Sequence, residues 1–260
     1  MTNLNDHEKN ALQYYIGDVS GTDPFWSDPK AYVVLNSLFF NGTETEHARA
    51  AEGKYLNPAI LSDEHRLTEL LSALFSAFHK CSTDKELHTF RVERWSDYLP
   101  CRSSGRTISF MSTSTAGFLS NYRDRSGIAL MKFTLQPGTP CIDIANALDF
   151  YAKPDEAEIL LPPFLELKIT EIRVSENEKT ILDSEGKAPR SSCMVTAGQI
   201  KSCRVPETEM PYGGTEAGQR VFKALNEGMI PSSEDDELFS QWKAAYLSHL
   251  HHLFLEQNNQ

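Results

Sequence analysis

Apolar residues recur with helical spacing in the first third of the chain. Between Leu61 and Lys80, apolar side chains fall at i, i+3, i+4, i+7 and i+11, namely at Leu67, Leu70, Leu71, Leu74 and Phe78. This spacing predicts one amphipathic helix with a single buried stripe, and Ser62 or Asp63 can cap its start. A turn-rich stretch, Pro24–Pro29, precedes a second apolar segment, Ala31–Phe40. We therefore expect residues 1–86 to be mainly helical.

The pattern changes to short β-type runs between residues 87 and 206. The candidate strands are Leu87–Trp95, Thr107–Ser112, Gly127–Leu135, Cys141–Ile144, Glu156–Leu161, Phe164–Val174, Met194–Ile200 and Cys203–Val205. In Phe164–Val174, apolar residues at 165, 167 and 169 alternate with polar ones, as in a half-buried strand. The apolar phase then slips to Ile172, which predicts a β-bulge.

The tail, residues 207–260, returns to a helical pattern. Its apolar face consists of Leu238, Phe239, Trp242, Ala245, Tyr246 and Leu253. Ser233 precedes an acidic first turn, which suits the positive end of a helix dipole. The order helix, sheet, helix predicts an α+β fold. We expect one domain over residues 1–206, helical over 1–86 and sheet-forming over 87–206, with a helical extension, 207–260, packed on it.

Composition and charge restrict the classes of function. The 260 residues are 40% hydrophobic and 23% charged, which is ordinary for a globular protein. The formal net charge is −11 and Lys and Arg form no dense cluster, so nucleic acid is not an expected partner. The five cysteines are widely spaced and contain no C-x-x-C pair. This predicts neither a disulfide framework nor a zinc site.

The N-terminal residues are polar and lack the apolar run of a secretory signal peptide. No apolar stretch approaches the ~20 residues that a membrane-spanning helix needs. We therefore expect no membrane span and a cytoplasmic location. Delivery into a target or host cell would use a route independent of a signal peptide.

Three polar segments carry the candidate chemistry. The first strand of the β region places Arg91 after His88-Thr89-Phe90, and the second delivers the triplet Ser112-Thr113-Ser114. Glu-x-Glu occurs four times in the chain, but only Glu156 and Glu158 lead into a strongly apolar strand, Ile159-Leu160-Leu161-Pro162-Pro163. Two carboxylates at i and i+2 at the head of a strand would share one face of the pleat.

In this order, the segments resemble the R-S-E class of mono-ADP-ribosyltransferases, the cholera-toxin-like and arginine-specific branch. The resemblance covers roughly residues 12–175 and includes the apolar segment after the glutamates. It implies an ADP-ribosyltransferase-like mixed β-sheet that uses NAD as co-substrate, without a metal. It further implies transfer of ADP-ribose to an arginine of a target protein, with release of nicotinamide, by a bacterial effector or toxin.

The resemblance also assigns residues to the NAD end of the reaction. Arg91 would bind an NAD phosphate, because a guanidinium presents a planar fork of donors. Val92 stands where many members have glycine, and its main-chain N–H and C=O would contact the nicotinamide amide. In the following loop, Phe118 or Tyr122 would stack on nicotinamide, and Arg123 or Arg125 would reach the pyrophosphate.

The remaining roles concern the bond that breaks and the acceptor. Ser112 would hydrogen-bond Glu158, and Thr113 and Ser114 would form the floor of the nicotinamide pocket. Glu158 would accept a hydrogen bond from the ribose and stabilise the positive charge that develops there. Glu156 would orient and deprotonate the acceptor arginine. Tyr151 would contact the target protein.

Two other functions stay open at this point. The same site with water as acceptor would make the chain an NAD glycohydrolase. A member without activity would serve as a binding module of the same fold. The complete set of arginine, hydroxyl triplet and glutamate pair disfavours the inactive alternative.

Overall fold

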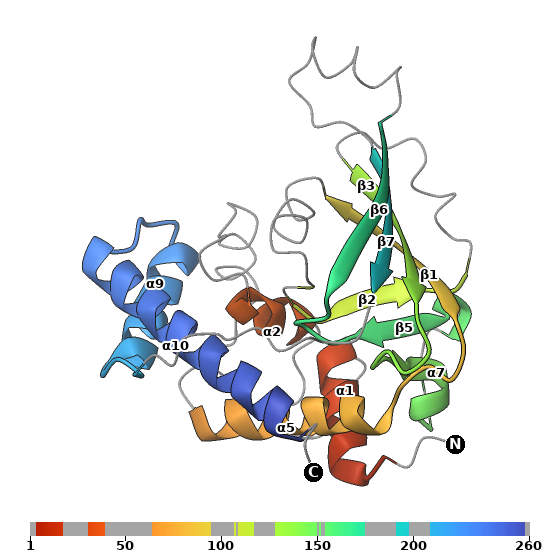
Figure 1. Cartoon of the computed structure of the whole chain (residues 1–260). Coiled ribbons are helices and arrows are strands. Elements are labelled where there is room, and N and C mark those ends of the chain that lie inside the picture. Colours follow the sequence, from red (N-terminus) through yellow and green to blue (C-terminus); the bar gives the residue numbers. More distant parts are fainter. Residues whose placement is uncertain are drawn as a thin grey trace. The chain divides into compact units, whose positions relative to one another are not determined.

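The structure is a computed structural model, and it describes residues 4–17, 31–39, 64–94, 107, 109–116, 128–149, 151, 154–174, 191–197 and 209–257. The chain forms two compact units. The sheet unit consists of Met1–Thr2 and Cys81–Lys201, and the helical unit of Asn3–Lys80 and Ser202–Gln260. Helices and a β-sheet thus occupy different regions of the chain (Figure 1), which confirms the predicted α+β class.

A seven-stranded sheet in the order β4-β5-β2-β1-β3-β7-β6 forms the sheet unit. Its strands are β1 (Leu87–Arg94), β2 (Met111–Ser114), β3 (Ile128–Leu135), β4 (Ile142–Asp143), β5 (Glu158–Leu161), β6 (Leu167–Val174) and β7 (Ser191–Ala197). Only the β3–β7 pair is parallel among these strands. A short helix, α7 (Ile144–Ala147), and a 3-10 turn, η3 (Pro154–Glu156), connect β4 to β5.

An apolar cluster forms the core of the sheet unit. Its buried members are Met111, Met131, Phe133, Leu135, Cys141, Ile159, Leu161, Leu165 and Leu167. Cys81 and Cys141 are buried and not joined in a disulfide, and the Cys141 N–H donates to the Cys81 carbonyl at 3.2 Å. Burial, followed by the neighbouring Cys81, raises the pKa of Cys141 to about 12. The Cys141 thiol is therefore protonated and unreactive at neutral pH.

Several predicted strands have other bounds in the structure: β5 begins at Glu158, β6 at Leu167 and β7 at Ser191, and the changes at β2 and β4 have identifiable causes. β2 starts at Met111 and contains the whole hydroxyl triplet, whereas the sequence pattern predicted a strand over Thr107–Ser112. Thr107 instead bonds the segment after β5, because its N–H donates to the Leu165 carbonyl at 2.9 Å and its hydroxyl to the Pro162 carbonyl at 2.8 Å. β4 contains Ile142 and Asp143 only, since α7 begins at the next residue.

The predicted bulge is confirmed in β6. Its pairing with β7 shifts register between Ile169 and Glu171, where the apolar phase slips in the sequence. The predictions for Pro24–Pro29, Ser62, Asp63 and Cys203–Val205 concern positions outside the described residues.

Five helices make up the described portion of the helical unit: α1 (Asp6–Ile16), α2 (Ala31–Phe39), α5 (Glu64–Lys80), α9 (Gly214–Asn226) and α10 (Ser233–Gln257). Every member of the predicted stripe on α5 is buried, which confirms that helix and its orientation. The predicted face of α10 is also buried at Phe239, Trp242, Ala245 and Tyr246. Thr68 of α5 and Tyr246 of α10 share a hydrogen bond of 3.0 Å, so the tail packs on the N-terminal helices.

The helix α9, which the sequence pattern did not single out, packs tightly against α10. A Cβ atom at Gly214 would lie 2.3 Å from Trp242 Cβ, and one at Gly218 would lie 2.6 Å from Phe239 Cε2. On α10, the ring of Trp242 stacks on that of Tyr246 at a centroid distance of 4.8 Å. Glycine at 214 and 218 therefore allows the backbone of α9 to approach a row of aromatic rings.

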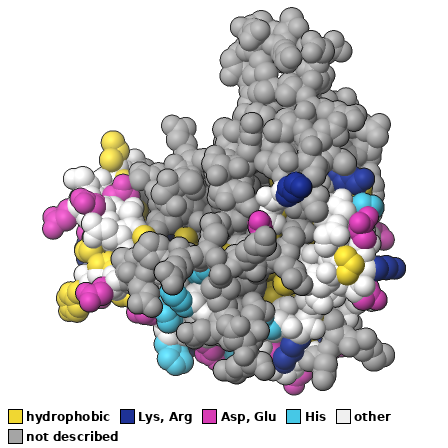
Figure 2. Space-filling model, in the orientation of Figure 1, with side chains coloured by type: hydrophobic (Ala, Val, Ile, Leu, Met, Phe, Trp, Pro, Cys, Tyr) yellow, Lys and Arg dark blue, Asp and Glu magenta, His cyan; other side chains and the backbone are white. Residues whose placement is uncertain are grey.

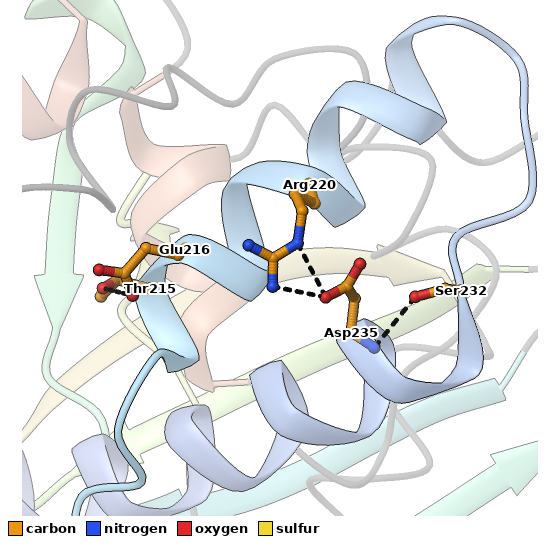
Figure 3. Close-up of polar contacts among 5 residues, drawn as sticks. All are labelled: Thr215, Glu216, Arg220, Ser232 and Asp235. Carbon is orange, nitrogen blue, oxygen red and sulfur yellow. Dashed lines mark hydrogen bonds and ion pairs between the residues drawn. The ribbon is translucent and has the colours of Figure 1, made fainter.

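Polar contacts near the α9–α10 turn close this hairpin (Figure 3). Arg220 of α9 donates to the carboxylate of Asp235 on α10, at 2.7 Å from Nη2 and 2.9 Å from Nε. The Asp235 N–H donates to the Ser232 hydroxyl at 3.2 Å. The residue that caps α10 is therefore Ser232, and the acidic turn Glu234–Asp236 follows it.

Acidic and apolar side chains are exposed together on the α9–α10 hairpin, at the left of the view in Figure 2. The exposed apolar residues include Met229 and Ile230 between the two helices, and Tyr212 just before α9. None of the helices that the structure describes is long and apolar enough to cross a membrane.

Candidate active site

Arg91, the hydroxyl triplet and Glu158 lie on three adjacent strands, β1, β2 and β5 (Figure 1). Ser114 of β2 pairs with Phe90 of β1 on one side and with Glu158 of β5 on the other. Neighbouring strands lie about 4.8 Å apart, so the backbones at Phe90 and Glu158 are roughly 10 Å apart. Paired residues share a face of an antiparallel sheet, which places Ser112, Ser114 and Glu158 on the same side.

Arg91 is half-buried on β1, next to the residue that pairs with Ser114. Its Nη1 donates to the Ser112 carbonyl at 2.6 Å. This bond holds the guanidinium beside the hydroxyl triplet. Val92 follows in β1, so its main-chain groups lie on the same strand.

The hydroxyls of the triplet bond the main chain of the glutamate segment. Thr113, which is buried, donates to the Ile159 carbonyl at 2.8 Å. Ser114 donates to the Glu156 carbonyl at 2.5 Å and accepts the Ala116 N–H at 2.9 Å. Two of the three hydroxyls thus fix the backbone that carries the carboxylates.

Glu158 is the first residue of β5, and only 8% of it is exposed. The hydroxyl of Tyr151 donates to its Oε2 at 2.6 Å. Among the described residues this phenol is the side-chain donor to Glu158, whereas the resemblance assigned that place to Ser112. Ser112 pairs with Leu160, two residues further along β5. Its contact with Glu158 remains a prediction.

Glu156 does not share the strand with Glu158, so the predicted arrangement of two carboxylates on one pleated face is wrong. β5 begins at Glu158, and Glu156 is an exposed residue of η3. Between them, Ala157 has a φ of 43°, its N–H donates to the Pro154 carbonyl, and its carbonyl accepts the Thr115 N–H, both at 3.1 Å. This left-handed turn leaves Glu156 in solvent and Glu158 buried.

A left-handed conformation at a residue other than glycine costs on the order of 1–3 kcal/mol. At Ala157 the surrounding bonds from Thr115 and Ser114 maintain it. Such strained positions cluster at functional sites. The strain at Ala157 therefore marks the glutamate segment as a candidate site independently of any resemblance.

The rest of the predicted site concerns residues outside the described portion of the chain. These are Phe118, Tyr122, Arg123 and Arg125, whose proposed contacts with NAD remain predictions. Within the described residues, no group of three or more His, Cys, Asp and Glu side chains could hold a metal ion.

No protein-family model matches the chain, and no curated protein sequence matches it. Among solved structures, the chain is similar to the Clostridium limosum C3 exoenzyme, with 16% identity and a TM-score of 0.46 over 76% of this chain and 88% of that chain. It is similar to the enzymatic component C2-I of the C2 toxin from Clostridium botulinum, with 17% identity and a TM-score of 0.47 over 77% and 45%. The Vis toxin from Vibrio splendidus, an ADP-ribosyltransferase, gives 17% identity and a TM-score of 0.44 over 77% and 78%. These similarities describe the backbone path over part of the chain and not its activity.

Proposed function

We propose that this chain is an NAD-dependent mono-ADP-ribosyltransferase that modifies an arginine of a target protein and releases nicotinamide. The observation that carries the proposal is the alignment of buried Glu158, through Ser114, with the strand that bears Arg91. A carboxylate, hydroxyls and a guanidinium on three adjacent strands are the groups that a ribose and a pyrophosphate require. This set of donors and acceptors fits NAD.

Glu158 would act on the nicotinamide ribose. As the bond from the ribose C1′ to the nicotinamide nitrogen breaks, its electron pair leaves with nicotinamide and positive charge develops on the sugar. A buried carboxylate stabilises that charge more strongly than one in water. Glycoside hydrolases place carboxylates beside the same kind of centre.

Arg91 would hold the opposite end of NAD. Its bond to the Ser112 carbonyl fixes the guanidinium beside the triplet. Arginine carries five N–H donors in a rigid fork, which suits phosphate oxygens. The bond to the Ser112 carbonyl brings the Arg91 guanidinium to β2, the strand between β1 and β5, and we infer that one ligand contacts both Arg91 and Glu158.

Glu156 would serve the acceptor, because its exposed position in η3 is open to a protein surface. An arginine side chain stays protonated in water and is a poor nucleophile. A carboxylate that takes its proton allows the bond from an arginine nitrogen to the ribose C1′ to form. The two glutamates then have separate tasks, in agreement with their different exposure.

The wider assignments also belong to this proposal. We place catalysis in residues 1–206, with 207–260 as an extension, and assign the protein to the effectors or toxins that act inside another cell. The contact of Thr68 with Tyr246 supports an extension that stabilises the N-terminal helices.

The two glutamates provide the test. Glu158→Ala should lose nicotinamide release by about 100- to 1,000-fold or more, as expected for one well-placed electrostatic group. Glu156→Ala should still release nicotinamide slowly, but should no longer label protein. Labelled NAD, incubated with and without cell lysate, measures both reactions, and mass spectrometry identifies the modified residue.

Each other outcome selects a different function. Free ADP-ribose without labelled protein in the wild type would indicate a glycohydrolase, and no loss of NAD would indicate a binding module. A modified residue other than arginine, or normal labelling by Glu156→Ala, would refute the arginine specificity.

A further inference from the structure

The hydroxyl of Tyr151 lies at the NAD end of the candidate site. It donates to Oε2 of Glu158 at 2.6 Å, and both side chains are at least half-buried. A bond of this length from a hydroxyl to a carboxylate belongs to the short, charge-assisted class. The resemblance, in contrast, assigned Tyr151 to the surface that meets the target protein.

The main chain at Glu158 is fixed without Tyr151. Its Cα pairs with Ser114 across the β2–β5 ladder, and the preceding turn is fixed by the bond from Ser114 to the Glu156 carbonyl. A glutamate side chain nevertheless keeps three rotatable torsions. Strand pairing cannot orient its carboxylate, and the phenol of Tyr151 can.

The hydrogen bond from Tyr151 leaves the Glu158 carboxylate able to act on a ligand. An ionised carboxylate offers about four lone-pair positions, and the Tyr151 bond occupies one on Oε2. A neutral phenol also leaves the negative charge uncompensated, unlike a lysine or arginine. The carboxylate is therefore oriented while it keeps the charge that a positively charged sugar would meet.

We propose that Tyr151 is a positioning residue for NAD cleavage that acts through Glu158. This inference rests on the proposed function. Cleavage precedes the choice between water and protein as acceptor, so loss of the Tyr151 hydroxyl slows both reactions by the same factor. A residue that contacts only the target protein would affect transfer alone.

The test is Tyr151→Phe, which removes the hydroxyl and keeps the ring. The kcat for nicotinamide release should fall about 10- to 100-fold, the worth of a hydrogen bond to a charged group, equally with water and with protein as acceptor. The KM for NAD should stay within about twofold, because ground-state binding does not use this bond. Tyr212→Phe, at a fully exposed tyrosine of the helical unit, is the matched control and should change neither constant.

A double variant distinguishes loss of the Tyr151–Glu158 hydrogen bond from a general disturbance of the fold. In the Glu158→Gln background, Tyr151→Phe should cause no further loss of residual cleavage, since residues that act as a unit are not additive. A further multiplicative loss would overturn the positioning role.

Other results overturn the inference in distinguishable ways. A loss confined to protein labelling would make Tyr151 a target contact, and a change confined to KM would make it an NAD contact. If the wild type cleaves NAD and Tyr151→Phe cleaves it at the same rate, the positioning role of Tyr151 is refuted and the proposed function is not. A wild-type protein that leaves NAD intact would refute the proposed function, and the role of Tyr151 with it.

Discussion

The helical unit and the sheet unit each bury a glutamate, and the two carboxylates have different hydrogen-bond and charge partners. Glu8 of α1 is 2% exposed. Its carboxylate accepts the Asn5 N–H at 2.9 Å and the Ser76 hydroxyl at 2.6 Å, and pairs with the Lys80 ammonium at 2.7 Å. Three donors, one of them a cation, compensate the buried charge, so Glu8 is a structural residue that ties α1 to α5.

Glu158 of β5 has a different environment. It is nearly as buried as Glu8, yet its side-chain donor among the described residues is one neutral phenol, from Tyr151. Burial of an uncompensated charge opposes folding. Such a destabilising arrangement is typical of sites that need the charge for a ligand. Burial alone therefore does not identify a functional carboxylate, whereas the kind of partner does.

The pKa of Glu8 reflects its compensation. Burial by itself would raise the pKa, but the hydrogen bonds from Lys80, Ser76 and the Asn5 N–H outweigh burial and hold the pKa of Glu8 below its usual value. The folded state therefore favours the ionised form of Glu8.

The largest effect should follow from removing the charge of Glu158. Glu158→Gln keeps the shape of the side chain and should lower nicotinamide release about 100- to 1,000-fold. Its free energy of unfolding, measured in urea, should stay near the wild-type value or rise, because a neutral amide is less costly to bury. Near-wild-type turnover, or a large loss of stability, would remove the contrast with Glu8.

Glu8→Gln should give the opposite result. The amide has no charge and one acceptor oxygen instead of two, so it cannot form the ion pair with Lys80 and cannot accept from Ser76, Lys80 and the Asn5 N–H together. The free energy of unfolding should therefore fall by about 1–3 kcal/mol. Turnover per folded molecule should be unchanged, as measured by kcat under conditions where the variant is folded. Glu69→Gln, at an exposed glutamate of α5, is the control and should leave stability almost unaltered. Loss of kcat in Glu8→Gln would contradict the structural role.

Acid should weaken the helical unit through Glu8. Because its pKa is lower in the folded state, the stabilisation from Glu8 is complete above its unfolded value of about 4.3 and disappears as the pH falls through the lowered folded value. Urea titrations at decreasing pH should therefore show a smaller loss of stability for Glu8→Gln than for the wild type. Parallel curves for the two proteins would contradict the shift.

The smallest effect should come from the Arg220–Asp235 pair of the α9–α10 hairpin. The hydrogen bond from Arg220, followed by that with Ser232, lowers the pKa of Asp235 (Figure 3), but both side chains reach solvent. Exposed pairs contribute little and are screened by salt. Asp235→Asn should barely change the unfolding temperature, and any difference should shrink in high salt. A clear drop in the unfolding temperature of Asp235→Asn in high salt would show that this pair stabilises the fold more than an exposed ion pair does.

Much of the fold could be predicted from local periodicity. The buried stripe of α5 and the bulge of β6 appear where the spacing of apolar residues indicates them. Periodicity reports which face of an element is apolar, and a face that is apolar has to be buried. It is less informative where other contacts compete, as at Thr107, which leaves the β2 ladder to bond the Pro162 segment.

The candidate site, like the fold, was predictable from the sequence only in part. The sequence by itself determined which residues carry the candidate chemistry: Arg91, the hydroxyl triplet and the two glutamates. Only the tertiary structure decided that β5, β2 and β1 are neighbours, that a left-handed Ala157 separates the glutamates, and that Tyr151 reaches Glu158. The physical reason is that residue type and spacing are local properties of the chain. Strand order, a strained turn and the orientation of a carboxylate arise from contacts between segments that are not adjacent in sequence.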